Sequence, residues 1–278
     1  MIDEILEAVE RALEEDIGSG DITSQACVPE NREATGIFLA RENQIIAGTG
    51  VLPLIYGIRG GVDRLDVHKH DGDRAADGET IAVVKGRART LLECERVALN
   101  FLQRLSGVAT LARQYADRVA GTNCKVLDTR KTTPGLRRLE KMAAAAGGVT
   151  NHRMGLFDAI LIKNNHIAAA GGVRNALENL RANARTAGLP VEIEVRTKEE
   201  LIEALDCGAT SLLLDNLTPA EAAARIRFIA GRATVELSGG ITLESVRAYA
   251  ETGADFVSAG AITHSARAMD ISFRLELA

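Results

Sequence analysis

Residues 125–131 read KVLDTRK, a short apolar run that ends in an acid and two cations. Five similar runs follow along the chain, and most of the intervals between them have the apolar periodicity of an amphipathic helix. The six runs begin near residues 125 (KVLD), 159 (AILIK), 191 (VEIEV), 211 (SLLLD), 234 (TVELS) and 255 (DFVSA). Strands that alternate with helices build a parallel sheet with right-handed crossovers. Because no G-x-G-x-x-G follows the first run, we predict a closed or nearly closed α/β barrel, although only six strands are evident.

The chain before these runs has a different rhythm. Short strand-like segments broken by turn residues occupy residues 33–40, 44–52, 64–70 and 80–86. An amphipathic helix is expected in the first 18 residues, whose acidic start resembles no export signal, and a long helix is expected over 91–119. We therefore predict an N-terminal α+β domain over residues 1–110 and a barrel domain over 111–278, with a C-terminal segment that could return to the first domain.

Composition excludes several classes of protein. The 278 residues are 46% apolar and 26% charged, which is ordinary for a soluble globular protein. The net charge of −5 argues against a nucleic-acid-binding surface, and no run of 18 apolar residues predicts a transmembrane helix. The four cysteines are scattered with no C-x-x-C pair, so we expect reduced thiols and a cytoplasmic location.

Polar or glycine residues follow each expected barrel strand. Active sites of α/β barrels are assembled at the carboxyl ends of the strands, where the loops converge. The residues at these ends are, in chain order, Asp128 with Arg130 and Lys131, Lys163 with Asn164, Asn165 and His166, Glu194, Asp215, Ser238 with Gly239 and Gly240, and Ser258 with Gly260 and His264. Six polar strand ends in succession indicate an enzyme.

The region from 128 to 166 is basic within an acidic chain, with seven Lys or Arg and three acids. Three of these cations, Arg137, Arg138 and Lys141, fit a helical pattern, and we expect two of them on a solvated face. The cations at strand ends or in loops are Arg130, Lys131, Arg153 and Lys163. Arginine binds carboxylates and phosphates through two parallel hydrogen bonds, so a substrate with several negative charges is expected.

Two acids and a glycine pair are expected at the same mouth. Glu194 and Asp215 could form ion pairs with the cations, or could hold Mg²⁺, which takes one or two carboxylates and leaves other positions to substrate phosphates. The Ser-Gly-Gly at 238–240 suits close approach of a phosphate to the backbone, or an ordinary turn. Polyanion, metal and phosphate together favour phosphoryl, pyrophosphoryl or phosphoribosyl transfer.

Long segments of the chain resemble the quinolinate phosphoribosyltransferase family. They are EEDIGSGDITS (14–24), ECERVALNFLQRLSG (93–107), DTRKTTPGLR (128–137), GGVTNHR (147–153), DAILIKNNH (158–166), VEIEV, LLLDN, VELSGG (235–240) and SAGAITHSA (258–266). The resemblance implies transfer of phosphoribosyl from phosphoribosyl pyrophosphate to quinolinate with decarboxylation, which gives nicotinate mononucleotide, CO₂ and pyrophosphate for NAD synthesis. It also implies an N-terminal α+β domain, an incomplete barrel of six or seven strands, and a homodimer with shared active sites that could assemble into a hexamer.

The resemblance assigns roles by position. The residues matched to the quinolinate carboxylates and neighbouring phosphates are Arg130, Lys131, His152, Arg153 and Lys163. The residues matched to the phosphate-binding loops are Ser238, Gly239, Gly260 and His264. Arg96 matches an arginine contributed by the partner subunit, and Glu194 and Asp215 match residues near Mg²⁺, ribose and pyrophosphate. We expect Lys131, Lys163, Glu194 and Asp215 to be catalytic. His152 is left open as clamp or proton donor, and Asn164 stands where the family often has Asp.

Three other functions remain open at this point. Lys163 at a strand end could be the nucleophile of a Schiff-base lyase, if Lys131 and Arg153 lie close enough to keep it neutral. A paralogue of the molybdate-transport-linked type would share the DTRKT segment and act on a different acid. A non-catalytic anion-binding module would use the cations alone, but leaves the acids and the glycine pair without a role.

Overall fold

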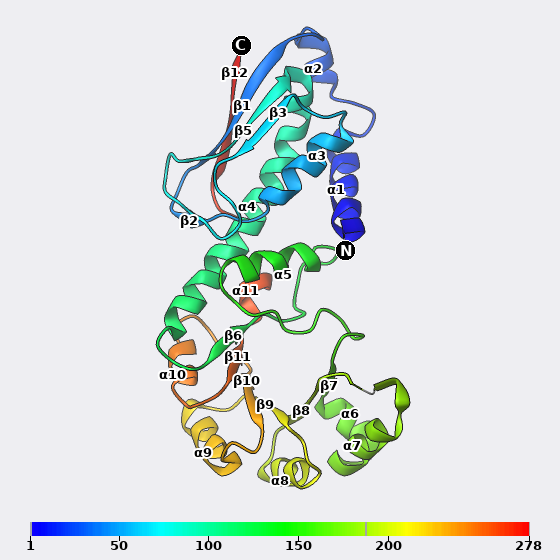
Figure 1. Ribbon diagram of the computed structural model, residues 1–278, viewed down its shortest axis with the longest axis vertical. Helices are drawn as coiled ribbons and strands as arrows, with labels where there is room; N and C mark the ends of the chain where they lie inside the picture. Colours follow the sequence, from blue (N-terminus) through cyan, green and yellow to red (C-terminus); the bar gives the residue numbers. More distant parts are fainter. Residues whose placement is uncertain (1, 187, 278) are drawn as a thin grey trace. The chain divides into compact units, whose positions relative to one another are not determined.

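The computed structural model describes residues 2–186 and 188–277. The chain forms two compact units (Figure 1). The first unit comprises the residues up to Arg113, Thr132–Gly148 and the residues from Ile262 onward. The second comprises Gln114–Lys131 and Val149–Ala261. The chain therefore leaves the first unit and returns to it twice.

A four-stranded antiparallel sheet is the centre of the first unit. Its strands, in the order in which they lie, are β12 (Ile271–Leu277), β1 (Glu33–Ala40), β5 (Thr80–Arg87) and β3 (Arg64–Val67). Phe38 on β1 packs against Phe273 on β12 with ring centroids 4.8 Å apart. A Cβ atom on Gly36 would lie 2.1 Å from the Phe273 ring, so only glycine lets this ring lie over β1. Aromatic packing thus fixes the C-terminal strand in register on an N-terminal one.

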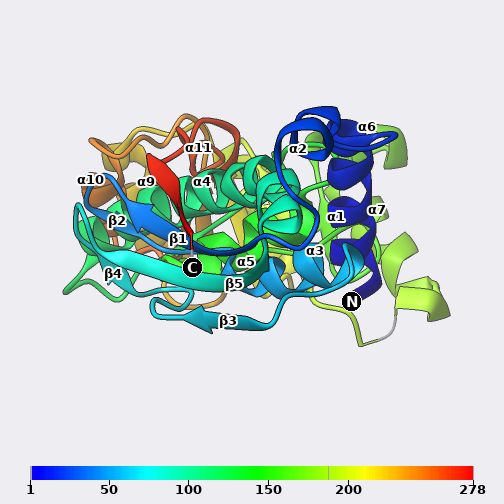
Figure 2. The same cartoon turned by 90° about the horizontal axis from the view of Figure 1, so that it is seen from above.

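Helices and a short ladder complete the first unit. They are α1 (Ile2–Ile17), α2 (Ile22–Cys27), the 3-10 helix η1 (Thr49–Val51), α3 (Leu52–Ile58), α5 (Arg137–Ala146) and the ladder of β2 (Gln44–Ile45) with β4 (Arg74–Ala75). Helix α1 lies beside α3 in both views (Figures 1 and 2). The long helix α4 (Ala88–Val119) starts directly after β5, and its residues from Gln114 belong to the second unit. The short helix α11 (Ala261–His264) begins where the chain re-enters the first unit.

The strand expected over 44–52 is wrong beyond its first two residues. Gly48 has a left-handed backbone (φ +92°), which ends the extended conformation. The amide and hydroxyl of Thr49 then donate to Asp71 at 3.0 and 2.7 Å, and a 3-10 turn leads into α3. The apolar residues of this segment are buried through a helix, although their sequence is equally typical of a strand.

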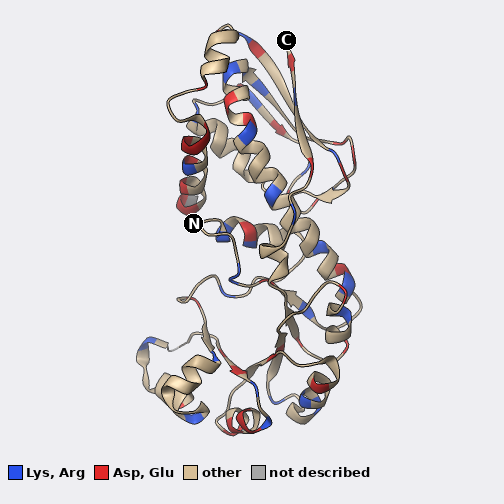
Figure 3. Ribbon diagram, turned by 180° about the vertical axis from the view of Figure 1, so that it is seen from behind, with Lys and Arg blue, Asp and Glu red and all other residues tan. Residues whose placement is uncertain are grey.

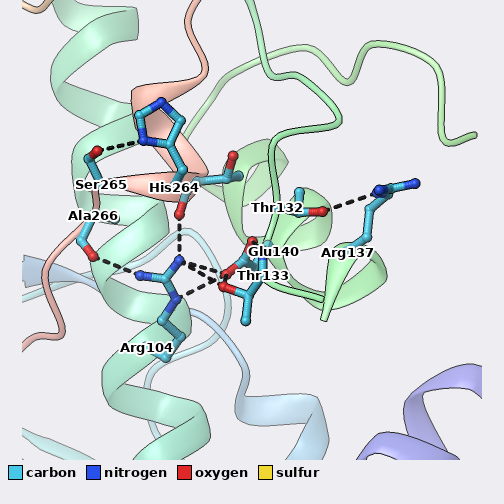
Figure 4. A network of polar contacts seen from close by, with 9 residues as sticks. Arg104, Thr132, Thr133, Arg137, Glu140, His264, Ser265 and Ala266 are labelled. Carbon is cyan, nitrogen blue, oxygen red and sulfur yellow. Dashed lines mark hydrogen bonds and ion pairs between the residues drawn. The ribbon is translucent and has the colours of Figure 1, made fainter. Parts of the chain in front are cut away.

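A buried ion pair joins the three stretches of the first unit (Figure 4). Glu140 on α5 is completely buried, and its Oε1 accepts from Nη2 and Nε of Arg104 on α4 at 2.6 and 3.0 Å. Arg104 also donates to the carbonyl of Ala266 at 2.7 Å and to that of Thr263. The amide and hydroxyl of Thr133 donate to Glu140 at 3.0 and 2.7 Å. One charge pair therefore links α4, the segment containing α5, and the C-terminal segment.

The three cations expected on the helix after Pro134 do lie on α5. Arg137 and Arg138 are half-buried, which agrees with a partly solvated face for two of the three. Lys141 is completely buried instead. The helical periodicity of the sequence alone did not distinguish the buried Lys141 from Arg137 and Arg138.

The second unit contains a six-stranded parallel sheet, which confirms all six strands predicted for the barrel. The strands, in the order in which they lie, are β6 (Lys125–Leu127), β11 (Phe256–Ser258), β10 (Thr234–Ser238), β9 (Ser211–Asp215), β8 (Val191–Val195) and β7 (Ile160–Ile162). Beside β6, Leu127 forms an isolated parallel bridge with Thr150, in the place of a seventh strand. Among the described residues β6 and β7 are not paired, so the barrel is incomplete.

Helices follow the strands of this sheet along the outside of its arc (Figure 1). They are α6 (Asn164–Ala170), α7 (Val173–Ala182), the 3-10 helix η2 (Ala184–Thr186), α8 (Lys198–Asp206), α9 (Pro219–Ile229) and α10 (Val246–Ala250). Capping boxes start α8 and α9, where Thr197 pairs with Glu200 and Thr218 with Glu221. Among the described residues, none of the helices has both the length and the apolar character needed to cross a bilayer.

We expect Glu140→Ala to lower the free energy of unfolding by about 3–5 kcal/mol, because it leaves the Arg104 guanidinium without its partner in a largely buried place. Urea unfolding followed by circular dichroism would measure this loss. Glu251→Ala is the matched control, since Glu251 forms an exposed pair with Arg247 and should change stability by at most about 1 kcal/mol. Equal losses in the two variants would show that the buried pair does not hold the unit together.

Candidate active site

The structure places ten of the twelve predicted site residues in the second unit, where most follow the carboxyl ends of its strands. These ten are Arg130, Lys131, His152, Arg153, Lys163, Glu194, Asp215, Ser238, Gly239 and Gly260. The other two belong to the first unit. Arg96 is exposed on α4, and His264 is exposed at the end of α11, where its Nδ1 lies 2.6 Å from the Ser265 hydroxyl (Figure 4).

The two predicted acids lie at the same edge of the sheet. Arg196, which the sequence analysis did not single out, bridges them: its Nη2 lies 3.1 Å from Glu194 Oε1 and 3.9 Å from Asp215 Oδ2. Asn216 Nδ2 also donates to Asp215 at 2.6 Å. In this arrangement the acids form the ion pairs that the sequence left as one of two alternatives.

The same two acids offer a donor set that fits Mg²⁺. Both present carboxylate oxygens, the ligands that this ion prefers, and among the described residues one cationic group pairs with both acids. That group is the side chain of Arg196, which is 48% exposed and therefore free to turn away into solvent. The positive charge of a divalent ion would replace that of the guanidinium.

The glycine pair after β10 packs against the end of β9. Gly239 has φ +100°, and a Cβ atom there would lie 2.3 Å from Asn216 Oδ1 and 2.7 Å from the backbone nitrogen of Asn216. The backbone amide of Asn216 donates to the Ser238 carbonyl at 2.9 Å. Gly239 is therefore needed for close approach of the backbone beside Asp215, whereas Gly240 has no atom within 4 Å of its Cβ position.

Two arginines of the site lie close enough for their charges to interact. Burial lowers the pKa of Arg153, and so does the nearby charge of Arg130. Arg153 Nη1 donates to the Ala159 carbonyl at 3.0 Å, but its buried Nε has no hydrogen-bond partner among the described residues. An anion placed here would separate the like charges and accept from the buried donor.

The two predicted lysines differ from these arginines in being exposed. Lys163 directly follows β7, and its amide donates to His166 Nδ1 at 2.9 Å. The Lys131 amide donates to Thr129 Oγ1 at 3.0 Å. A Schiff-base lysine has to be desolvated or lie beside another cation, and the exposure of Lys163 does not supply the first condition.

Two functional candidates, Glu192 and Glu236, were missed by the sequence analysis. His152 Nε2 lies 3.5 Å from Glu192 Oε2 and 3.3 Å from Glu236 Oε2. Acidic residues stand among the apolar residues of strands β8 and β10 (Figure 3). These acids within expected strands could have been selected as site candidates from the sequence. Both acids sit at alternate positions with a residue already chosen, Glu194 on β8 and Ser238 on β10, and so point to the same face.

Burial and charge act on this cluster in opposite directions. Burial lowers the pKa of His152, but the hydrogen bonds and charges of Glu192 and Glu236 outweigh it and raise the pKa to about 9. Burial raises the pKa of Glu236, and the hydrogen bond from His152 lowers it in part. The cluster therefore holds protons more firmly than isolated carboxylates would.

The loop that carries His152 is fixed from β6. Asp128 directly follows that strand and is completely buried. Its carboxylate accepts from Asn151 Nδ2 at 2.7 Å and from the His152 amide at 2.8 Å. Asp128 thus positions a loop more than twenty residues further along the chain.

Comparison with known proteins covers both units. A family model of the N-terminal domain of quinolinate phosphoribosyl transferase matches residues 21–106, and a model of the C-terminal domain matches residues 108–274. A nicotinate-nucleotide pyrophosphorylase (carboxylating) from Mycobacterium leprae is 43% identical over 97% of this chain and 96% of its own. The crystal structure of nicotinate-nucleotide pyrophosphorylase from Ehrlichia chaffeensis superposes with a TM-score of 0.92 at 36% identity, covering 97% of this chain and 98% of that one.

A plant relative matches as broadly. A quinolinate phosphoribosyltransferase (decarboxylating) from Nicotiana tabacum is 40% identical over 98% of this chain and 82% of its own. That protein is named as mitochondrial, and the cytoplasmic location expected of this chain stays a prediction.

We expect Gly239→Ala to be more destabilising than Gly240→Ala, although both residues have left-handed backbones. The strain of that backbone costs an alanine about 1–2 kcal/mol at either site. At Gly239 the contact with Asn216 adds about 1–3 kcal/mol of overpacking, because backbone atoms cannot move aside. Urea unfolding of the two variants would measure the difference, and equal losses would show that the end of β9 yields to the added methyl group.

Proposed function

The chain belongs to the quinolinate phosphoribosyltransferase family and is a decarboxylating phosphoribosyltransferase of NAD biosynthesis, and we propose that its strand ends bind quinolinate and phosphoribosyl pyrophosphate with Mg²⁺. The single observation that carries the residue assignment is the pair of neighbouring arginines. Arg130 and Arg153 repel one another, and the buried Nε of Arg153 has no acceptor within the part of the chain that the structure describes. Quinolinate carries two adjacent carboxylates, and such a dianion matches both requirements.

The chain's residues act as electrostatic clamps in the transfer step. The pyridine nitrogen of quinolinate attacks ribose C1, and the bond from C1 to the pyrophosphate oxygen breaks. Arg130, Lys131 and Arg153 hold quinolinate with its nitrogen in line with ribose C1. The loss of translational and rotational entropy then occurs on binding, which lowers the activation barrier of the transfer step. Lys163 and the backbone amides near Ser238 and Gly260 would stabilise charge that develops on the phosphates. No nucleophilic side chain is required.

Decarboxylation follows from the charge on the ring. Once the nitrogen carries the ribose, the ring is cationic, and the bond to the 2-carboxylate breaks with its electron pair left on C2. The ring charge stabilises that carbanion, which then takes up a proton to give nicotinate mononucleotide. The cations near the remaining 3-carboxylate keep the ring in place during this step.

Glu194 and Asp215 would hold the magnesium ion. When bound, the ion neutralises charge on the pyrophosphate leaving group. Arg196 would then release the two acids, and its exposure allows that movement. The exposed Arg96 would reach the active site of a partner subunit in a homodimer, and the exposed His264 would contact a phosphate.

A direct assay tests the function. We expect the purified protein to convert quinolinate, phosphoribosyl pyrophosphate and Mg²⁺ to nicotinate mononucleotide and CO₂, with loss of product in EDTA and none from nicotinate. Turnover of nicotinate alone would refute the decarboxylating assignment. Product that is unaffected by EDTA would refute the role of the metal.

The cation assignment has its own test. Arg130→Ala and Lys131→Ala should each lower kcat/KM for quinolinate by about 100-fold or more with little change in stability, because each removes a charge that the transition state needs. Arg64→Ala is the matched control: Arg64 is an exposed cation on β3 in the first unit, and it pairs with Asp66 two residues away. A near-normal kcat/KM in either cation variant would remove that residue from the mechanism.

A further inference from the structure

Arg196 lies between the two acids of the proposed metal site. Its Nη2 is 3.1 Å from Glu194 Oε1 and 3.9 Å from Asp215 Oδ2, and its Nε donates to the same Glu194 oxygen at 3.2 Å. The guanidinium therefore pairs with the same two carboxylates that are proposed to hold Mg²⁺, and it cancels one of their two negative charges.

Glu194 needs a positive partner because it is buried. It lies on β8 and is 5% exposed. An ionised carboxylate that is removed from water is costly unless a cation or hydrogen bonds compensate its charge. Arg196 supplies this compensation, and a divalent cation at the same carboxylate would supply it in place of Arg196. The guanidinium and a metal ion therefore compete for Glu194.

The backbone of Arg196 is fixed, whereas its side chain reaches solvent. The Arg196 amide donates to Glu200 Oε2 at 2.7 Å, beside the capping box that starts α8. The side chain is 48% exposed. It can therefore leave the two acids by a change of rotamer, with no change of the fold.

A lone metal ion and an ion that carries phosphates differ in what they offer the displaced guanidinium. Mg²⁺ bound by one or two carboxylates leaves its other positions to water and substrate phosphates. When water fills these positions, Arg196 exchanges its ion pairs for solvent. When pyrophosphate oxygens fill them, negative charge lies near the released guanidinium, which binds phosphate through parallel hydrogen bonds.

We propose that Arg196 is a specificity-determining residue that favours metal-bound phosphoribosyl pyrophosphate over the free metal ion. It weakens the binding of a lone divalent cation to Glu194 and Asp215, and it pairs with the pyrophosphate group once these acids hold the metal. Occupation of the site by a metal without its substrate is thereby disfavoured. The inference rests on the proposed function, because it concerns how the metal and the substrate of that same site are bound.

Binding of Mn²⁺ alone to the substrate-free protein tests the first part of the proposal. Mn²⁺ also prefers oxygen ligands, and the relaxation rate of water protons measures its binding. Arg196→Gln should bind Mn²⁺ about 5- to 20-fold more tightly than the wild type, because a positive charge beside both carboxylates is removed. The glutamine amide can still donate to the buried Glu194. Arg196→Lys keeps the charge and should stay within about threefold of the wild-type affinity.

Steady-state kinetics at saturating Mg²⁺ test the second part. In Arg196→Gln, KM for phosphoribosyl pyrophosphate should rise about 10-fold, the loss of a hydrogen bond between charged groups. KM for quinolinate should stay within about twofold, because no contact with its carboxylates is removed. Arg247→Gln is the matched control, since Arg247 is a 45% exposed arginine of the same unit that pairs with Glu251. This control should leave the Mn²⁺ affinity and both KM values within about twofold of the wild type.

The two expected effects have opposite signs, which a merely structural role of Arg196 would not produce. Unchanged or weaker Mn²⁺ binding in Arg196→Gln, or an unchanged KM for phosphoribosyl pyrophosphate, would overturn the inference. Equal tightening of Mn²⁺ binding in Arg247→Gln would reveal a general effect of net charge and would overturn it as well. Absence of wild-type turnover would instead refute the proposed function, whereas the Mn²⁺ comparison requires no turnover.

Discussion

The first unit depends on one buried charge pair. Its three stretches are separated in sequence by segments of the other unit, and Arg104 with Glu140 contacts all three. A buried pair of this kind often adds little net stability over an apolar pair, but each partner makes the other indispensable. The surrounding hydrogen bonds to Thr133 and two carbonyls give the pair a directional geometry that apolar contacts would lack. It therefore specifies which segments meet.

In the second unit the equivalent constraint is the alternation of side chains along parallel strands. One face of each strand packs under the helices, and the other carries the acids and serines of the site. Two pairs of acids on this face each have a basic side chain between them. Arg196 lies between Glu194 and Asp215, and His152 lies between Glu192 and Glu236. Arg130 and Arg153, where the substrate is proposed to bind, place two like charges close together.

Most of the architecture could be predicted because it is encoded in local patterns. The six parallel strands, the long helix α4 and the first strand β1 follow apolar periodicity, and the structure confirms them. Apolar periodicity gave a wrong prediction where a tertiary contact determines the backbone conformation. Asp71 holds Thr49 in a turn, and the apolar sequence around Thr49 does not predict that turn. The partners of His152 were missed for a similar reason. They depend on the loop that Asp128 folds, and no local pattern says which carboxylates a loop histidine will reach.

The pairing of β12 with β1 also has a consequence for synthesis on the ribosome. Arg41, directly after β1, donates to Ser272 on β12, and these two residues are 231 positions apart in the sequence. At elongation rates of about 5–20 residues per second, the later segment emerges roughly 10–50 s after the earlier one. During that interval β1 has an open hydrogen-bonding edge on the side that β12 will occupy. A nascent chain is therefore exposed to pairing with other strands, and chaperones that cover strand edges would be expected to act in this period.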